Sequence, residues 1–263
     1  MSYEHILLDK QDQIATIILN RPERYNAFVG LMRQEILHAL EDVAGDPDVR
    51  VVVITGSGKA FCTGGDVNEF ASGTTQAFSE TPTSERHAMC KSVLIINGME
   101  KPVIAAVNGV AAGGGCNLAL SCDIRIASEK ARFGQVFTRR GLHPDWGGIY
   151  FLPRLVGYAK AAELIFSGDV IDVEEAFKIG LVNKVVPHEE LKTATYDMAS
   201  RMAKNAPIPI AFAKRGLQNF NRWDLDQALD YESYVLEITR KSEDFKEGFA
   251  SFLEKREPVF KGR

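Results

Sequence analysis

The chain has 263 residues, 45% of them hydrophobic and 25% charged, with a formal net charge of −4 and a pI of about 5.8. This length fits one large domain, or one domain with an appendage. The acidic balance argues against nucleic acid as the main partner. The first residues lack the basic and apolar regions of a signal peptide, and no apolar run approaches the roughly 20 residues that cross a bilayer. We therefore expect a cytoplasmic protein with neither a nucleic-acid nor a membrane partner.

The four cysteines, at positions 62, 90, 116 and 122, have no regular spacing. Disulfide frameworks and zinc sites both place cysteines at characteristic intervals. The sequence therefore predicts buried free thiols and no metal site.

Strands and helices alternate through the first half of the chain. The predicted strands are Ile6–Asp9, Ile14–Asn20, Val51–Ile54, Pro102–Val107 and Ile124–Ala127, and the predicted helices are Leu31–Val43 and Arg86–Met99. The first two strands form a predicted hairpin, and the segment from Ala71 to Ser84, rich in Ser, Thr, Gly and Pro, predicts a mobile surface loop. The alternation favours an α/β fold with parallel strand pairing.

Two glycine-rich turns follow predicted buried strands, one at Phe61–Asp66 and one at Gly113–Gly115. In parallel sheets, ligands bind outside the carboxyl ends of the strands. A glycine cluster that opens a helix leaves backbone N–H groups exposed at the positive end of the helix dipole. Such a turn binds an anion, or an oxygen that becomes anionic during a reaction. The alternative is a tight turn that only allows close packing of strand and helix.

The chain becomes mostly helical from Tyr150 onward. The predicted helices are 158–166, 173–179, 189–204, 207–220, 225–241 and 245–255. We therefore divide the chain into a core, residues 1–206, and a helical C-terminal region, residues 207–263. Helices added after an α/β core often serve assembly, and packing on their own core is the alternative.

Six motifs in this order resemble the crotonase, or enoyl-CoA hydratase/isomerase, family. They are Asn20–Ala27, Phe61–Asp66, Lys101–Gly109, Gly113–Cys116 with Cys122–Ile124, Pro144–Gly148 with Leu152–Arg154, and Glu247–Phe249 through Arg256.

The resemblance implies a fold and a chemistry. The fold is a spiral of ββα units followed by a helical trimerisation region, assembled as a homotrimer or homohexamer. The chemistry forms an enolate from an acyl-CoA thioester, whose oxygen is held by two backbone N–H groups. The motifs place those donors at Gly65 and Gly114. Coenzyme A is part of the substrate, so the resemblance implies no separate cofactor.

The resemblance also implies the residues that contact the substrate. Arg24 and Lys255 are expected to pair with phosphates, although a solvated surface cation is the alternative at each position. Phe137 and Trp146, with Tyr150 and the loop 71–84, are expected to shape the acyl pocket. The remaining CoA contacts are Ala27, Thr63, Asp66, Val67 and, with Lys255 from a neighbouring subunit, Phe252.

The sequence departs from typical hydratases at two positions. Those enzymes carry glutamates where this chain has Asn117 and Phe137, and hydration normally uses both carboxylates. Asp145 remains as the candidate acid/base, although a turn aspartate or helix cap is the alternative. We expect Phe137 and Trp146 to raise the pKa of Asp145.

With an aspartate at this position and no glutamate at the other two, the chain resembles the acyl-CoA isomerases of the family that use a single aspartate. It is most similar to those that act on 1,2-epoxyphenylacetyl-CoA in phenylacetate degradation. The predicted function is therefore isomerisation of a double bond or ring. A hydratase of fatty-acid or aromatic-acid degradation is the first alternative, and a non-catalytic acyl-CoA-binding module the second. Dehalogenation would need a partner histidine, for which His87 and His143 are candidates.

Overall fold

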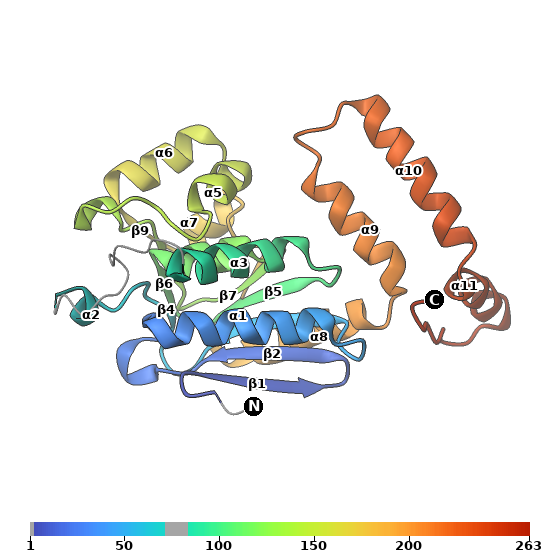
Figure 1. Ribbon diagram of the computed structural model, residues 1–263, viewed down its shortest axis with the longest axis horizontal. Helices are drawn as coiled ribbons and strands as arrows, with labels where there is room; N and C mark the ends of the chain where they lie inside the picture. Colours follow the sequence, from blue (N-terminus) through green and yellow to red (C-terminus); the bar gives the residue numbers. More distant parts are fainter. Residues whose placement is uncertain (1–2, 72–83) are drawn as a thin grey trace.

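The computed structural model describes residues 3–71 and 84–263 (Figure 1). Only the two end residues of the predicted loop 71–84 belong to these ranges, so the loop lies outside the described residues. None of the helices in the described ranges is both long enough and apolar enough to cross a bilayer.

The main sheet has six strands in the order β1-β2-β3-β5-β7-β10. β1 and β2 form the predicted antiparallel hairpin, and every other neighbouring pair is parallel. The strand bounds are β1 Ile6–Gln11, β2 Ile14–Leu19, β3 Val51–Gly56, β5 Val103–Val107, β7 Ile124–Ser128 and β10 Lys184–Val186.

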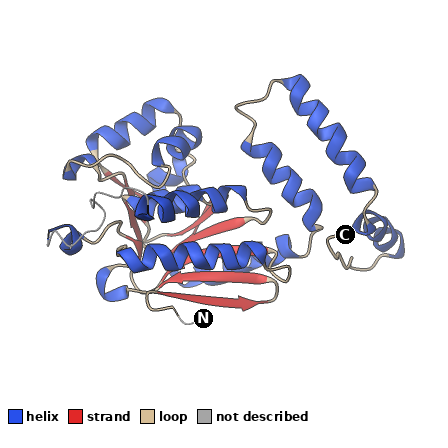
Figure 2. Cartoon of the chain, viewed as in Figure 1, coloured by secondary structure: helices blue, strands red, loops and turns tan. Residues whose placement is uncertain are grey.

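Both faces of this sheet are covered, as the β-branched run in β3 predicts. Val52 and Ile54 point into the core cluster that also contains α1 (Gly30–Gly45), whereas Val51 and Val53 pack into a second cluster with α8 (Leu191–Ala203). Figure 2 shows the sheet lying between these helices. The predicted α/β fold with parallel pairing is therefore confirmed.

A second sheet of four short strands, in the order β4-β6-β8-β9, lies at the carboxyl ends of the main strands. The strands are β4 Ala60–Cys62, β6 Val110–Ala112, β8 Arg132–Gly134 and β9 Val170–Asp172. β4, β6 and β8 each follow a main-sheet strand, which gives the repeated ββ unit of the expected spiral. None of the four was predicted, because three residues are too few for a hydrophobic period to be read.

The helices for which the sequence predicts a range agree with it to within a few residues, whereas α2, α4 and α5 had no predicted range. Besides α1 and α8, the helices are α2 Val67–Ala71, α3 Ser84–Gly98, α4 Gly114–Ser121, α5 Gly148–Val156, α6 Tyr158–Ser167, α7 Val173–Lys178, α9 Pro207–Gln218, α10 Leu225–Arg240 and α11 Glu243–Glu254, with 3-10 turns at Pro22–Arg24, Thr138–Arg140 and His188–Glu190. Local capping explains the sharp starts in the C-terminal region. Asp224 makes a capping box with Gln227 before α10, and the Ser242 side chain caps α11.

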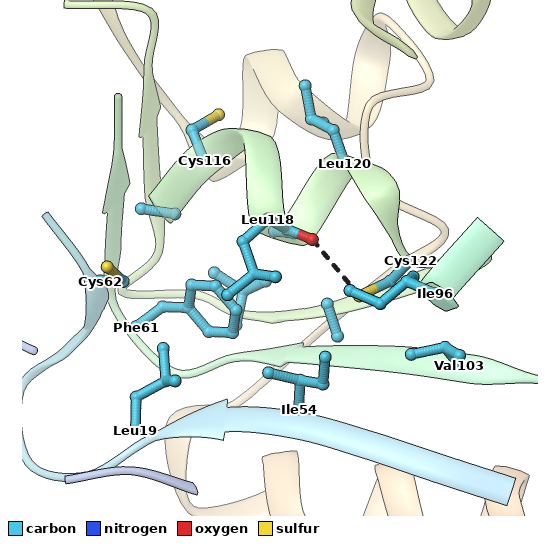
Figure 3. Close-up of a cluster of buried hydrophobic side chains, with 14 of the residues drawn as sticks. Leu19, Ile54, Phe61, Cys62, Ile96, Val103, Cys116, Leu118, Leu120 and Cys122 are labelled. Carbon is cyan, nitrogen blue, oxygen red and sulfur yellow. Dashed lines mark hydrogen bonds between the residues drawn. The ribbon is translucent and has the colours of Figure 1, made fainter. Parts of the chain in front are cut away.

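All four cysteines are free thiols. Cys62, Cys116 and Cys122 are buried in the apolar cluster around Phe61 and Leu118 (Figure 3). The prediction of buried thiols is wrong for Cys90, which is exposed on α3.

Helices α9 to α11 extend away from the sheet as a separate arm (Figure 1). α9 begins at Pro207, where the sequence predicts the C-terminal region to begin. An ion pair with a buried lysine joins this arm to the core: Lys214 Nζ in α9 lies 2.8 Å from Asp123 Oδ2. The division into a catalytic core and an assembly region stays a prediction.

Candidate active site

The two predicted glycine turns meet in the structure. A Cβ atom built on Gly64 would lie 3.3 Å from the backbone nitrogen of Gly114 and 3.0 Å from the carbonyl oxygen of Ala112, and the φ of Gly64 is +86°. A Cβ on Gly115 would lie 2.1 Å from the carbonyl oxygen of Cys62. Side chains at these positions would push the turns apart, so glycine permits the close approach of β4 to α4.

Each turn offers an N–H group with no partner inside its own element. Gly114 is the first residue of α4, and the first N–H groups of a helix have no intrahelical acceptor. Gly65 forms a parallel bridge with Phe28, in which the bonds are made by Gly64 and Asp66 on either side of it. The N–H of Gly65 therefore points away from Phe28. The geometry suits two donors for one oxygen, with the positive end of α4 behind one of them.

The carboxyl group of Asp145 lies beside this pair. Its Oδ1 is 3.2 Å from the position that a Cβ on Gly114 would occupy. The carbonyl oxygen of Asp145 accepts a bond from the Gly148 N–H at 2.9 Å, which closes a turn before α5. The residue that caps α5 is Gly147, with no side-chain cap bond. Asp145 is therefore not the helix cap that its sequence context also permits.

The surroundings of Asp145 favour its protonated form. Desolvation raises the pKa of the carboxyl to about 6, against the opposing effects of the Arg33 charge, the Asp145 N–H and the His143 charge. The residue as a whole nevertheless remains exposed to solvent. The carboxyl is thus crowded by protein atoms and still reachable by a substrate, and its pKa suits proton transfer near neutral pH.

Two aromatic rings adjoin the second glycine turn, and their part in the acyl pocket stays a prediction. Trp146 is 4% exposed, stacks on Phe28 with ring centroids 4.8 Å apart, and would lie 3.0 Å from a Cβ on Gly114. Phe137 is 6% exposed, and its Cζ would lie 3.7 Å from a Cβ on Gly113. Trp146 has a φ of +47°, which is strained for a bulky residue.

Three residues at the site carry roles that the sequence reasoning missed. The Asn117 side chain is fully buried, donates to the Asp145 carbonyl oxygen at 2.8 Å and accepts from Gln135 Nε2 at 2.7 Å. Arg33 in α1 is 5% exposed, and its charge acts on both Asp145 and Cys62. A signal for Arg33 was present, because a charged residue occupies the apolar stripe of α1.

The predicted CoA-binding segments also lie together. Arg21 joins them: its Nη1 donates to the Ala27 carbonyl oxygen at 2.6 Å, and its Nη2 lies 3.2 Å from Asp66 Oδ2. Burial raises the pKa of Asp66, but bonds from the Asn68 N–H and Arg21 outweigh it and hold the pKa below its usual value. The Asp66 carboxylate is therefore already engaged within the protein.

Of the other predicted contacts on this side, Ala27 is buried, whereas Val67 and Arg24 remain open to a ligand. Val67 is 58% exposed, and Arg24 is exposed on the neighbouring 3-10 turn. The Thr63 N–H donates to the carbonyl oxygen of Tyr25 at 3.2 Å, which joins the two segments.

The single chain does not bring Phe252 and Lys255 to the site. Phe252 is 80% exposed on α11, and Figure 1 shows α11 at the far end of the arm from α2. Their assignment to a neighbouring subunit's site stays a prediction.

Tyr150 lies in different surroundings, and its part in the acyl pocket stays a prediction. The Arg154 guanidinium lies 3.6 Å from its ring centroid, and Tyr150 lines a cleft of about 690 Å³ between α5 and α9. Its position on α5 turns it toward the arm.

The remaining nucleophile and base candidates give little support to other chemistry. Burial raises the pKa of Cys62 and Cys116 to about 12, so both thiols stay protonated and act in packing. His143 is exposed, with Nδ1 2.7 Å from the carbonyl oxygen of Pro144. The His87 side chain lies outside the described residues. Within the described ranges, no three or more His, Cys, Asp or Glu side chains form a group that could hold a metal ion.

Comparison with known proteins decides the family. A sequence model described as enoyl-CoA hydratase/isomerase matches residues 9–263. The chain belongs to the enoyl-CoA hydratase/isomerase family. It is 41% identical to crotonyl-CoA hydratase from Syntrophomonas wolfei over 99% of each chain, and 35% identical to 1,2-epoxyphenylacetyl-CoA isomerase from Escherichia coli, again over 99% of each.

The fold of the family is confirmed in the same way. An enoyl-CoA hydratase structure from Bacillus anthracis superposes with a TM-score of 0.92 at 35% identity, covering 99% of this chain and 100% of that one. The crotonase resemblance that the six motifs indicate is therefore correct. Both hydratases and an isomerase occur among the relatives, so the family alone does not choose between the two reactions.

Proposed function

We propose that this protein isomerises an unsaturated acyl-CoA thioester, with Asp145 as the single acid/base and the N–H groups of Gly65 and Gly114 as the oxyanion donors. The observation that carries the proposal is the place of Asp145. Its carboxyl lies beside Gly114 with its pKa raised to about 6, while positions 117 and 137 hold an amide and a phenyl ring. The proposal needs no cofactor beyond the CoA moiety of the substrate.

One carboxylate is sufficient for this reaction. With a 3-enoyl thioester, Asp145 removes a proton from the α-carbon, and the C–H electron pair forms the enolate while negative charge moves to the thioester oxygen. The two N–H groups stabilise that charge. The protonated carboxyl then returns the proton to the γ-carbon, and the electrons shift to leave the double bond between the α- and β-carbons. Asp145 ends in its starting form.

The alternative is hydration of a 2-enoyl thioester. The 41% identity to a crotonyl-CoA hydratase favours it. Hydration, however, must both activate a water molecule and protonate the α-carbon. Asn117 and Phe137 cannot titrate, so Asp145 would have to serve both steps alone.

Replacing the carboxyl tests the proposal. We expect Asp145→Asn to lower isomerisation of 3-enoyl-CoA by at least about 10²-fold, because the amide cannot accept the proton. Binding of CoA thioesters, measured by calorimetry, should change little. Asp48→Asn, an exposed aspartate in the turn before β3, is the matched control and should keep full activity.

Isotopes distinguish the reactions. The protein is incubated with 3-enoyl-, 2-enoyl- and dienoyl-CoA esters in D₂O and in ¹⁸O-labelled water. Deuterium at carbon with a shifted double bond supports the isomerase, and ¹⁸O in the product supports the hydratase. Tight CoA-ester binding without turnover would instead identify a binding module, and full activity of Asp145→Asn would exclude Asp145 as the base.

A further inference from the structure

A directional chain of side-chain amides runs through the interior to the Asp145 turn. Gln135 Nε2 donates to Asn117 Oδ1 at 2.7 Å, and Asn117 Nδ2 donates to the Asp145 carbonyl oxygen at 2.8 Å. A backbone carbonyl can only accept, so the Asn117 amide must direct its nitrogen toward Asp145 and its oxygen toward Gln135. Both amides are buried, with Gln135 2% exposed, which makes each bond costly to lose.

The packing around Asn117 fixes its side chain in place. A Cβ on Gly148 would lie 2.3 Å from Asn117 Nδ2 and 2.7 Å from Asn117 Oδ1. Gln135 Nε2 also lies 3.5 Å from the Cys116 sulfur. The Asn117 amide therefore packs closely against the backbone of Gly148, and any side chain at position 148 would displace it.

The turn that Asn117 holds contains backbone strain. Trp146 and Gly147 both have positive φ, +47° and +76°, and only the glycine adopts such a conformation without cost. A non-glycine residue there costs of order 1–3 kcal/mol and persists only where its surroundings enforce it. The Asn117 bond and the stacking of Trp146 on Phe28 supply that enforcement.

Asn117 lies on the same helix as the proposed oxyanion donor. Gly114 and Asn117 are three residues apart in α4, so they lie on one face, one turn apart. A single rigid turn of helix thus fixes both the Gly114 N–H and the backbone of the residue that carries the carboxyl.

From this geometry we infer that Asn117, oriented by Gln135, is a positioning residue that holds the Asp145 carboxyl beside Gly114. The inference rests on the proposed function for its catalytic meaning. Asn117 stands where typical hydratases have a catalytic glutamate. It then contributes to the reaction by holding the Asp145 carboxylate in place.

The test compares Asn117→Leu, Asn117→Asp and Gln135→Leu with the parent. Leu removes the donor and keeps the branching of the side chain, whereas Asp keeps the shape and size but sets an oxygen against the Asp145 carbonyl oxygen. We expect kcat for 3-enoyl-CoA isomerisation to fall by about 10²-fold in both Asn117 variants, since a misplacement of about 1 Å costs that much, with KM nearly unchanged. Gln135→Leu leaves the bond from Asn117 to the Asp145 carbonyl oxygen in place, so its kcat should fall less than in the two Asn117 variants.

Asn108→Leu is the matched control. Asn108 is another buried asparagine that ties backbone segments together, with Nδ2 3.0 Å from the Ala60 carbonyl oxygen and Oδ1 3.2 Å from the Gly56 nitrogen. It does not bond to the Asp145 turn. We expect Asn108→Leu to lose stability but to keep its kcat at temperatures where it is folded.

A second measurement does not depend on activity. The Asp145 carboxyl is titrated by ¹³C NMR and assigned through Asp145→Asn. Arg33 of α1, Cys62 of β4 and His143 of the preceding loop are the ionisable groups that act on it, and all remain in the variants. In Asn117→Leu we expect the carboxyl pKa to fall from about 6 toward the ordinary aspartate value, because the released turn exposes it to water.

The outcomes separate the two claims. If the unsubstituted protein catalyses no proton exchange, the proposed function is refuted. The NMR titration would still test whether Asn117 positions the Asp145 carboxyl. An Asn117→Leu variant that keeps both its kcat and its Asp145 pKa would overturn the positioning role. A loss of kcat equal to that of Asn108→Leu would reduce Asn117 to a structural residue.

Discussion

Asp145 combines features that a structural residue does not need. Its carboxyl is desolvated, it adjoins a helix N-terminus, and it does not cap the helix that follows. Raised carboxyl pKa values of this kind gather at functional sites, because they cost stability and serve proton transfer. Its environment should therefore affect activity and stability in opposite directions.

The pH dependence follows from that pKa. In the unfolded chain Asp145 titrates near its ordinary value of about 3.9, whereas in the folded protein it titrates at about 6. Between these pH values the folded protein binds more protons than the unfolded chain. The stabilisation that comes from protonated Asp145 is therefore complete below pH 4 and is lost as the pH rises through 6. Activity changes the other way, because the base form appears as the pH rises through 6.

We therefore predict that Asp145→Asn is more stable than the parent at pH 7 and equally stable at pH 4. Denaturant unfolding at a series of pH values checks both statements, and the acidic limb of the kcat/KM profile of the parent checks the pKa of about 6. Parallel stability curves for the two proteins would contradict the raised pKa.

Helix α9 is the element that joins the arm to the core. Lys214 Nζ is surrounded by the Asp123 carboxylate at 2.8 Å and by the carbonyl oxygens of Ile96 and Lys101 at 2.8 and 2.9 Å. The lysine is 8% exposed. Burial also raises the pKa of Asp123, although Lys214 and the Val103 N–H act against this. The Lys214 charge therefore depends on these three oxygen acceptors in place of water, whereas the Asp123 carboxylate keeps part of its surface exposed.

We predict that Lys214→Met lowers the free energy of unfolding by about 2 kcal/mol, because it leaves two carbonyl oxygens and the Asp123 carboxylate without the buried ammonium group that binds them. The double variant Lys214→Met/Asp123→Asn should recover part of the loss. Denaturant unfolding at one fixed protein concentration measures both, and the exposed Lys204→Met is the control. Equal stability of Lys214→Met and Lys204→Met would show that the pair does not anchor the arm.

At the scale of the whole molecule, the arm exposes more apolar surface than an isolated chain usually keeps. Its exposed apolar side chains include Leu217, Phe220, Leu225, Tyr234, Phe249, Phe252 and Leu253. This surface supports the predicted homotrimer or homohexamer. In such an assembly Phe252 and Lys255 of one subunit would complete the site of its neighbour, which the single chain does not do.

Mixing subunits tests this arrangement. We predict that Asp145→Asn and Phe252→Ala/Lys255→Ala are each nearly inactive, and that assembling them together at equal amounts restores activity at about a quarter of the sites. Light scattering measures the assembly, and activity before and after subunit exchange measures the complementation. A mixture no more active than its components would place both groups in the same subunit's site or outside it.

The sequence by itself determined the alternation of strands and helices, the helices of the arm, the two glycine turns and the choice of Asp145. These follow from local rules: hydrophobic period, capping, glycine content and the short motifs shared with the family. The short strands β4, β6, β8 and β9 could not be predicted, because each consists of three residues that pair only where the main sheet brings them together.

Only the tertiary structure decided how the site is held. Gly114 and Asp145 are 31 positions apart, and their contact depends on how α5 packs on α4. Gln135, Asn117 and Asp145 form their bonded chain between α4 and two loops that are far from it in the sequence. The role of Asn117 is likewise decided by the Asp145 carbonyl oxygen opposite it. A hydrogen bond forms only when donor and acceptor have the right distance and direction. Both depend on how distant segments of the chain pack together, so they cannot be inferred from the sequence alone.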